Sequence, residues 1–331
     1  MNKAILLEKR PVGLPQLSDF TIVSNDIDTV TTGELLLKTT YVSVDPYLRS
    51  RMNDAKSYIP PFELHKPISS GIIAEVIDSK NTAFEKGDFV TGMLEWKEFQ
   101  KSNGEGLLKV DASKAPLSAY LGVLGLTGLT AYLGLTEIGK PKQGETIVVS
   151  GAAGAVGSIV GQIAKLYGCK VIGIAGTDDK VTMLKSSLGF DEAINYNETK
   201  NMTAAIKEAA PNGVDIYFDN VGGPISDAVL LNIKPFARFI ICGAISVYNN
   251  TELPKSISVQ PFLIKNSALM QGFIVFNYAE KYPEAIKQIS QWLAEGKLSY
   301  TETIVEGFDA IPQTFLDLFQ GKNKGKMLVK I

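Results

Sequence analysis

The pattern of hydrophobic and polar positions changes its period near the middle of the chain. Before residue 122, short alternating runs are separated by prolines and other turn formers, and they predict strands over 34–42, 71–77 and 88–93. Alternation with a period of two is typical of β-strands. This part of the sequence therefore predicts an antiparallel, barrel-like β domain.

From Thr146 onward the order becomes strand, helix, strand. Residues 146–150 are apolar without alternation, as in the central strand of a parallel sheet. Apolar positions three and four residues apart predict helices over 156–167, 180–188 and 282–293. The predicted strands cover 146–150, 170–175, 191–196, 214–219, 239–242 and 269–275. This alternation is typical of an α/β fold with a doubly wound parallel sheet.

The end of the sequence returns to β-like runs over 303–331, which predicts that the tail rejoins the first domain. The chain is too long for one ordinary core and suits two domains. The predicted organisation is a β domain of residues 1–122 with 300–331, and a nucleotide-binding domain of residues 123–299.

One uncharged segment, residues 115–136, is about as long as a membrane-spanning helix. Its several glycines and hydroxyl side chains make it only modestly hydrophobic, and it leads directly into the strand–helix pattern. Because glycines let backbones approach each other, we expect close-packed helices there rather than a membrane span.

The composition is that of a soluble globular protein, with 45% hydrophobic and 21% charged residues. The formal charge is −2, and no dense block of Lys or Arg suggests a nucleic-acid or anionic-lipid partner. Cys169 and Cys242 lie next to predicted strands and are expected to be buried, reduced thiols, since two cysteines cannot form a disulfide framework. The first apolar run is too short for a secretory signal, so we expect a cytoplasmic protein.

A glycine-rich turn, Ser150–Gly157, joins the first parallel strand to the following helix. The usual G-x-G-x-x-G spacing would place glycine at 152, 154 and 157, and here position 152 is alanine. Gly154 lets the backbone approach a pyrophosphate, Gly157 lets the helix pack on the strand, and the helix N-terminus offers free N–H groups. A purely structural turn is the alternative, but the flanking strand and helix favour dinucleotide binding.

The end of the second parallel strand indicates which dinucleotide binds. NAD enzymes usually place Asp or Glu there to hold the adenine ribose, whereas this chain has Gly176 followed by Thr177 and Lys180. Glycine leaves room for a 2′-phosphate and lysine attracts it, so NADP is favoured. Asp178 and Asp179 either cap the next helix or hold the ribose of NAD instead.

Residues for metal and hydrolytic chemistry are scarce. A catalytic zinc needs three protein ligands, and the chain has one histidine, His65, and two cysteines in the nucleotide domain. A Ser–His–acid hydrolase would need His65 as its base, and no G-x-S-x-G motif is present. We therefore expect no metal, a loop position for His65, and hydride chemistry that depends on the cofactor.

Several motifs, in one order and over nearly the full length, are similar to the prostaglandin reductase/2-alkenal reductase group of zinc-independent medium-chain dehydrogenase/reductases. They are VDPYLR at 44–49, GLTAY at 128–132, AAGAVG at 152–157, GQIAK at 161–165, FDNVGG at 218–223, CGAISVY at 242–248 and GKNKGK at 321–326. The resemblance implies a Rossmann domain inserted into a GroES-like β-barrel domain. The sequence departs from the family pattern at Leu48, Val247 and Lys324.

The resemblance also implies contacts with NADPH. Residues 153–156 would meet the pyrophosphate, and Lys180 with Tyr196 would lie around the adenine ribose phosphate. Asn323 would bring the tail to the cofactor. The expected cofactor-binding residues are Ala153, Gly154, Ala155, Val156, Gly157, Gly176, Lys180, Tyr196, Asn220, Cys242, Gly243, Ala244, Ile245, Ser246, Tyr248, Phe273, Ile274, Val275 and Asn323.

Two tyrosines are the candidate catalytic residues. Tyr248 would stabilise charge on a substrate oxygen, directly or through the nicotinamide ribose, and Tyr47 would contact the substrate. The alternatives are a packed tyrosine at a strand end for Tyr248 and a structural turn residue for Tyr47. Asn220, before two glycines, has the alternative of a turn former.

The resulting hypothesis is NADPH-dependent reduction of the C=C bond of α,β-unsaturated aldehydes and ketones, with hydride transfer to the β-carbon. Water could supply the final proton, so no dedicated acid is required. The alternatives are an NADPH quinone oxidoreductase of the same superfamily and a non-catalytic NADPH-binding protein. The family resemblance implies a homodimer joined through edge strands of the nucleotide domains.

Overall fold

The computed structural model describes every residue from Met1 to Ile331, and the chain packs into two compact units. Each unit has its own sheet. The first unit consists of Met1–Leu121, Glu302–Asn323 and Met327–Ile331, and the second of Gly122–Thr301 with Lys324–Lys326. The domain borders expected from the sequence stay a prediction.

The first unit is built mainly on antiparallel strands, as the alternating pattern predicts. Its larger sheet has the order β14-β15-β3-β4-β5-β7, with β6 paired to β3, and β1 pairs with β2 separately. The predicted strands 34–42, 71–77 and 88–93 are confirmed as β3, β4 and β5, with small shifts at their ends. The strands are β1 (Asn2–Leu7), β2 (Phe20–Asn25), β3 (Leu35–Ser43), β4 (Ser69–Ser79), β5 (Phe89–Glu95), β6 (Phe99–Ser102), β7 (Leu108–Val110), β14 (Glu302–Glu306) and β15 (Lys326–Lys330).

The tail contains a helix that the sequence pattern does not reveal. The β-like interpretation of 303–331 is wrong for its middle, where α9 spans Ile311–Phe319. Ile311, Phe315 and Leu318 lie on one face of α9 and are buried in the core of the first unit. The tail ends as a strand, because β15 pairs antiparallel with β3. A short helix, α1 (Leu48–Arg51), completes this unit.

The second unit contains the doubly wound sheet that the sequence predicts. Its strands are all parallel and have the order β10-β9-β8-β11-β12-β13. From β8, successive strands of the chain are added first on one side, to β10, and then on the other, from β11 to β13. The strands are β8 (Thr146–Ser150), β9 (Lys170–Ala175), β10 (Glu192–Asn195), β11 (Val214–Asp219), β12 (Ile233–Ile241) and β13 (Leu269–Gly272). β12 begins earlier than predicted, and β12 and β13 end before Cys242 and Phe273. The fold class, a Rossmann sheet with a GroES-like β domain, is confirmed.

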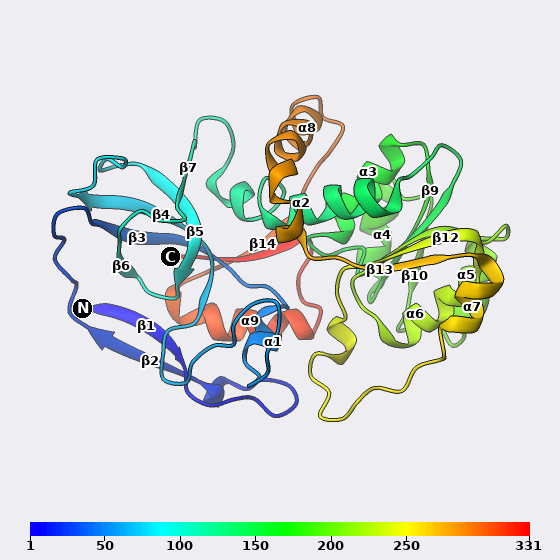
Figure 1. Ribbon diagram of the computed structural model, residues 1–331, viewed down its shortest axis with the longest axis horizontal. Coiled ribbons are helices and arrows are strands. Elements are labelled where there is room, and N and C mark those ends of the chain that lie inside the picture. Colours follow the sequence, from blue (N-terminus) through cyan, green and yellow to red (C-terminus); the bar gives the residue numbers. More distant parts are fainter. The chain divides into compact units, whose positions relative to one another are not determined.

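Helices cover both faces of the parallel sheet (Figure 1). The helices α5, α6 and α7 pack on one face, through a core that includes Val148, Ile172 and Tyr217. α3 and α4 lie on the other face, where the Phe190 ring fits against Gly161 of α3 and Gly173 of β9. The helices are α2 (Leu126–Leu133), α3 (Gly157–Leu166), α4 (Asp178–Ser186), α5 (Met202–Ala209), α6 (Gly223–Leu230), α7 (Gln260–Asn266) and α8 (Tyr282–Ala294).

The uncharged segment 115–136 forms short, closely packed helical segments, as expected. A Cβ atom on Gly128 of α2 would lie 1.8 Å from the carbonyl oxygen of Val123, so only glycine fits at this position. Tyr132 of α2 packs against Trp292 of α8, with ring centroids 5.9 Å apart. None of the helices combines the length and the apolar character that crossing a membrane requires.

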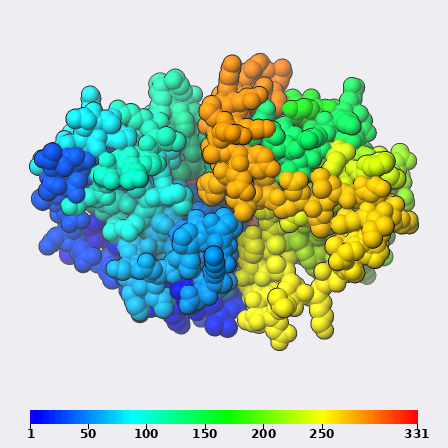
Figure 2. Space-filling model, in the orientation of Figure 1, coloured from blue at the N-terminus to red at the C-terminus, as the bar shows by residue number.

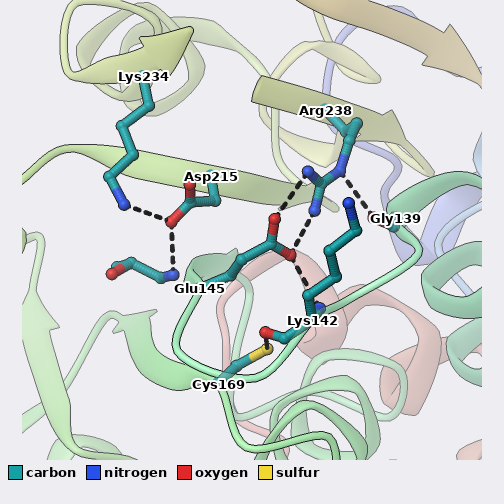
Figure 3. Close-up of polar contacts among 8 residues, drawn as sticks. Gly139, Lys142, Glu145, Cys169, Asp215, Lys234 and Arg238 are labelled. Atoms are coloured by element: carbon teal, nitrogen blue, oxygen red, sulfur yellow. Dashed lines mark hydrogen bonds and ion pairs between the residues drawn. The ribbon is translucent and has the colours of Figure 1, made fainter. Parts of the chain in front are cut away.

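A charged cluster ties the amino-terminal ends of the parallel strands together (Figure 3). Arg238 donates to both carboxylate oxygens of Glu145, at 2.9 and 2.6 Å, and to the Gly139 carbonyl at 2.8 Å. Asp215 accepts from the first backbone N–H of β8 at 2.8 Å and from Lys234 at 2.7 Å. Ligands of such sheets bind at the carboxyl ends of the strands, so this cluster at the opposite ends is structural.

Candidate active site

The carboxyl ends of the parallel strands meet at one edge of the sheet, and hydrogen bonds connect each strand end to that of its neighbour. The Asn220 side chain after β11 donates to the Ser150 carbonyl at the end of β8, at 2.8 Å. The Cys242 N–H after β12 donates to the Asp219 carbonyl at 2.9 Å, and the Phe273 N–H after β13 donates to the last carbonyl of β12 at 3.0 Å. The glycine loop, Asn220 and the segments after β12 and β13 therefore form one continuous edge.

The glycine loop fits a close approach of its backbone to a ligand. A Cβ atom on Gly157 would lie 2.4 Å from the Gly151 carbonyl oxygen, which fixes glycine where α3 begins. Ala152, the departure from the usual spacing, is fully buried, and its N–H donates to the Ile174 carbonyl at 3.1 Å. Since its side chain points into the protein interior, alanine at 152 leaves the ligand side of the loop unobstructed.

Gly176 and Tyr196 come together at the ends of β9 and β10, and Lys180 follows in α4. A Cβ atom on Gly176 would lie 2.7 Å from the Tyr196 hydroxyl, so a side chain there would displace that ring. Tyr196 is 43% exposed, and its backbone N–H donates to the Ala175 carbonyl at 3.0 Å. Burial lowers the pKa of Lys180, which lies in the first turn of α4. The assignment of these three residues to a 2′-phosphate stays a prediction.

Asp178 and Asp179 stand in the first turn of α4, where their negative charge suits the helix N-terminus. Asp178 accepts from the Asn195 side chain at 2.8 Å. Asp179 accepts from the Thr177 hydroxyl and forms an ion pair with Lys324, whose Nζ is 2.7 Å from Oδ2. The carboxylates are thus held by protein partners, which supports their role at the helix start over ribose binding.

Asp219 is a buried carboxylate that organises the loop after β11. It is 2% exposed, and its Oδ1 accepts four hydrogen bonds at 2.8–3.0 Å. The donors are the hydroxyls of Ser150 and Tyr217 and the backbone N–H groups of Val221 and Gly222. The carboxylate therefore fixes the turn that carries Asn220.

The segment Cys242–Tyr248 leaves the sheet instead of continuing β12. Gly243 approaches the Asn220 backbone closely, since a Cβ atom there would lie 3.1 Å from the Asn220 carbonyl oxygen. A short 3₁₀ turn at Ile245–Val247 then brings Tyr248 back toward the sheet edge, where its hydroxyl oxygen accepts from the Ala244 N–H at 3.2 Å. Burial raises the pKa of Tyr248, so it remains a neutral donor at ordinary pH.

The segment after β13 is largely buried, whereas the segment after Tyr248 is largely exposed. Phe273 and Val275 are buried and Ile274 is partly exposed. The segment 250–257 is almost entirely exposed and belongs to the yellow surface in Figure 2. Leu253, at 94% exposure, contacts little of the protein.

Tyr47 and Asn323 belong to the first unit. Tyr47 precedes α1 and packs partly buried against the core of that unit, where burial raises its pKa above the usual range. Its carbonyl oxygen accepts from the Ser50 hydroxyl at 2.7 Å, so the backbone of Tyr47 also shapes the turn into α1. Asn323 lies partly exposed between α9 and β15.

His65 and Cys169 lie as the sequence predicts, in a loop and buried, whereas Cys242 is only partly buried. His65 is an exposed loop residue whose Nδ1 is 3.6 Å from a carboxylate oxygen of Glu8. Cys169 and Cys242 are free thiols, and burial raises their pKa values to about 11 and about 12, so both stay protonated. The structure contains no group of three or more His, Cys, Asp and Glu residues that could hold a metal ion.

Three residues have a role in the site region that the sequence pattern does not reveal. They are Asp219, Ser150 and Lys324. The role of Asp219 can be inferred from its position in the sequence, because an acidic residue that ends a buried parallel strand needs hydrogen-bond donors. Ser150, at the end of β8, supports the same inference more weakly. Lys324 is visible in the sequence only as a departure from the family motif.

The fold and the glycine-lined edge define a dinucleotide-binding oxidoreductase, and comparison with known proteins identifies its family. Residues 3–110 match the family described as N-terminal domain of oxidoreductase, and residues 155–291 match the one described as zinc-binding dehydrogenase. The chain belongs to the zinc-independent medium-chain dehydrogenase/reductases, in the prostaglandin reductase/2-alkenal reductase group.

The relatives are similar over their full length. YfmJ of Bacillus subtilis (strain 168), named provisionally as an NADP-dependent oxidoreductase, is 55% identical, with 100% of this chain and 98% of YfmJ covered. Prostaglandin reductase 1 of Bos taurus is 45% identical, with 99% of this chain and 98% of the reductase covered. The crystal structure of CurA in complex with NADPH from Vibrio vulnificus is 43% identical, with a TM-score of 0.94 and 99% and 98% covered. The protein is an NADP-dependent oxidoreductase of the alkenal and prostaglandin reductase type.

The residues of this chain fit NADP(H), its cofactor. A Cβ atom on Gly154 would have only the Gly151 carbonyl oxygen within 4 Å, at 3.2 Å, so this side of the glycine loop is bare backbone that a pyrophosphate can approach. The N-terminus of α3 follows the loop and suits the same anionic group. Lys180 supplies a cation near the end of β9, where an NAD enzyme would place a carboxylate.

Proposed function

We propose that the protein reduces the C=C bond of α,β-unsaturated aldehydes and ketones with NADPH. The observation that carries the proposal is the position of Tyr248 at the carboxyl edge of the sheet. Its oxygen accepts from the Ala244 N–H, which leaves its proton to donate to a ligand. The relatives named 2-alkenal reductase and (+)-pulegone reductase support this reaction class.

Each element of the site has a role in this reaction. When bound, NADPH supplies the hydride, which goes to the β-carbon of the substrate. Tyr248 donates a hydrogen bond to the carbonyl oxygen of the substrate, directly or by orienting a ribose hydroxyl, where negative charge develops. Asn220 and residues 242–246 hold the cofactor, and residues 273–275 exclude water from it. Water delivers the last proton, so no dedicated acid is needed.

The remaining expected residues serve binding in this proposal. Lys180 and Tyr196 would contact the 2′-phosphate, Tyr47 the substrate and Asn323 the cofactor. The residues that would contact the pyrophosphate are Ala153, Gly154, Ala155 and Val156.

A substrate panel tests the proposed reaction. NADPH consumption should be rapid with an enal and an enone and negligible with the matched saturated ketone, because the C=C bond is the acceptor. NADPH deuterated at the transferred position should place deuterium on the β-carbon of a saturated carbonyl product, as measured by mass spectrometry. Formation of an allylic alcohol would contradict the proposal. Turnover of a quinone alone would favour the quinone reductase alternative, and no turnover at all would favour the non-catalytic one.

We further propose that the protein is a homodimer joined through edge strands of the nucleotide domains. β13 lies at one edge of the parallel sheet, and Leu269 at its start is 45% exposed. Exposed sheet edges are prone to pair with another chain. Sedimentation equilibrium should give twice the 35.8 kDa chain mass, and a monomer at micromolar concentration would refute the dimer.

We propose a cytoplasmic location. Cys169 and Cys242 are free thiols with raised pKa values, which suits a reducing compartment. NADPH-dependent reduction also needs a compartment that maintains the reduced cofactor. Fractionation of the source cells should recover the protein with cytoplasmic markers, and recovery with secreted proteins would rule this location out.

A further inference from the structure

A three-residue segment of the tail, Lys324–Lys326, belongs to the nucleotide-binding unit, although the residues on either side of it belong to the first unit. The Gly325 N–H donates to the Ala153 carbonyl at 2.8 Å, and Gly325 forms a parallel bridge with Gly154. The Lys326 N–H donates to the Thr301 carbonyl at 2.9 Å. The segment thus lies directly against the glycine loop.

Gly325 restricts where this segment can lie. Its φ is +63°, and a Cβ atom would lie 1.8 Å from the Thr301 carbonyl oxygen, so glycine is required here. Because Gly325 cannot move away from Thr301 without breaking the two backbone hydrogen bonds of the segment, the preceding residue is held beside the glycine loop. That residue is Lys324, one of the departures from the family motif.

The Lys324 side chain is directed to the first turn of α4. Its Nζ lies 2.7 Å from Oδ2 of Asp179, the residue that precedes Lys180. The hydrogen bond from Lys324 holds the pKa of Asp179 down to about 2. Burial lowers the pKa of Lys180, the charge of Asp179 raises it, and the charge of Lys324 lowers it. The ion pair thus places the Lys324 ammonium group at the first turn of α4, beside the residue that precedes Lys180.

We propose that Lys324 is a second cationic residue of the 2′-phosphate subsite, and that Asp179 holds its ammonium group there. A 2′-phosphate carries about 1.5 to 2 negative charges near neutral pH, which one lysine balances only in part. Asp178, Asp179 and Lys180 in the first turn of α4 carry a net charge of −1, and the ammonium group of Lys324 raises this to 0. The inference rests on NADP(H) as the cofactor and on the proposed roles of Lys180 and Tyr196, and it is independent of the substrate.

The role of Lys324 is one of specificity rather than general affinity. NAD lacks the 2′-phosphate, so Lys324 gains nothing from binding it. A lysine that served only to pair with Asp179 would affect both dinucleotides equally. The ratio of the two affinities therefore separates a specificity residue from a structural one.

The test is calorimetric titration of NADP⁺ and NAD⁺ into the full-length wild type and three variants, Lys324→Met, Lys180→Met and Asp179→Asn. Lys324→Met should weaken NADP⁺ binding by about 5- to 20-fold, because an exposed charge-assisted hydrogen bond contributes less than a buried one, and leave NAD⁺ within about twofold. The loss should shrink at high salt, because the contact is partly exposed. Asp179→Asn keeps an amide oxygen that can still accept a hydrogen bond from Lys324 and removes the competing negative charge, so NADP⁺ should bind equally or more tightly.

Two outcomes overturn the inference. One is equal weakening of NADP⁺ and NAD⁺ by Lys324→Met, or no weakening, with an unchanged melting temperature as evidence that the variant is folded. The other is a loss of NAD⁺ affinity in Asp179→Asn as large as its loss of NADP⁺ affinity, which would make the ion pair structural. The Lys180→Met variant distinguishes a wrong role for Lys324 from a wrong position of the 2′-phosphate subsite. If Lys180→Met also leaves NADP⁺ binding unchanged, the subsite itself is misplaced.

Discussion

Replacing Asp219 with alanine is expected to lower the free energy of unfolding by about 3 kcal/mol, because it removes the acceptor of four buried hydrogen bonds. The hydroxyls of Ser150 and Tyr217 can turn to other partners, but the two backbone N–H groups that bind the carboxylate cannot. The turn that carries Asn220 should therefore loosen. NADPH affinity of the folded protein should fall by at least about tenfold, since this turn lies at the cofactor edge of the sheet. Chemical denaturation and NADPH fluorescence titration measure the two effects.

A matched control lies on the same strand. Asp215 is also largely buried and accepts two hydrogen bonds, but at the amino-terminal end of β11 in the cluster of Figure 3. Asp215→Ala should cost about 1–2 kcal/mol of stability and leave NADPH affinity unchanged. If Asp219→Ala binds NADPH as tightly as Asp215→Ala does, the carboxylate of Asp219 does not position the cofactor loop.

The parallel sheet is predictable from the sequence because its strands are buried on both faces. Residues 146–150, 170–175 and 214–219 are largely apolar without alternation, and the structure gives these strands the predicted bounds. The glycine loop is predictable for a related reason, since the turn between a buried strand and a helix leaves little space for side chains. Local sequence determines these features without reference to the rest of the chain.

The helix α9 depends on contacts that the local sequence does not show. It has only nine residues, Pro312 stands at its start, and β-like residues precede it. A short apolar run of this kind fits a strand or a helix equally well, because it holds too few positions to separate the two periods. The core against which Phe315 packs is what defines the helical face.

The sequence pattern misses the first half of β12 for another reason. α6 ends at Leu230 and β12 begins at Ile233. Lys234 is polar, and Phe236 is 71% exposed with a φ of +63°, so the first half of β12 lacks the apolar run that marks the other parallel strands. The sequence pattern therefore predicts only the buried second half of this strand.

The residues of the candidate site also fall into two groups, those that local sequence predicts and those that only tertiary contacts reveal. Gly157 and Gly176 follow from local sequence, because each stands at a predicted strand or helix end where other atoms come close. Asp219 and Lys324 act through partners far away in the chain, and only the folded structure shows these pairs. Sequence patterns locate the edge of the sheet where a ligand binds, whereas the hydrogen bonds that fix its loops depend on tertiary structure.

Replacing Tyr248 with phenylalanine is expected to lower kcat on an enone by about 100-fold, the loss typical of removing one donor to a developing negative charge. The Kd of NADPH should change by less than about threefold, because the aromatic ring and its packing remain. The matched control is Tyr167→Phe, which removes a hydroxyl at the end of α3 farthest from the glycine loop and should leave both quantities unchanged. Stopped-flow turnover and fluorescence titration separate the two effects.

The pH profile gives a second, independent measure of the Tyr248 hydroxyl. Burial raises the pKa of Tyr248, so its neutral, proton-donating form persists to a higher pH than in a free tyrosine. Wild-type kcat should therefore show no loss from tyrosine ionisation up to about pH 10, the ordinary tyrosine pKa. A descending limb below that pH which disappears in Tyr248→Phe would mean that the hydroxyl ionises during catalysis. Unchanged turnover in Tyr248→Phe would remove this residue from the mechanism and leave the charge on the substrate oxygen to be stabilised by the cofactor ribose or by water.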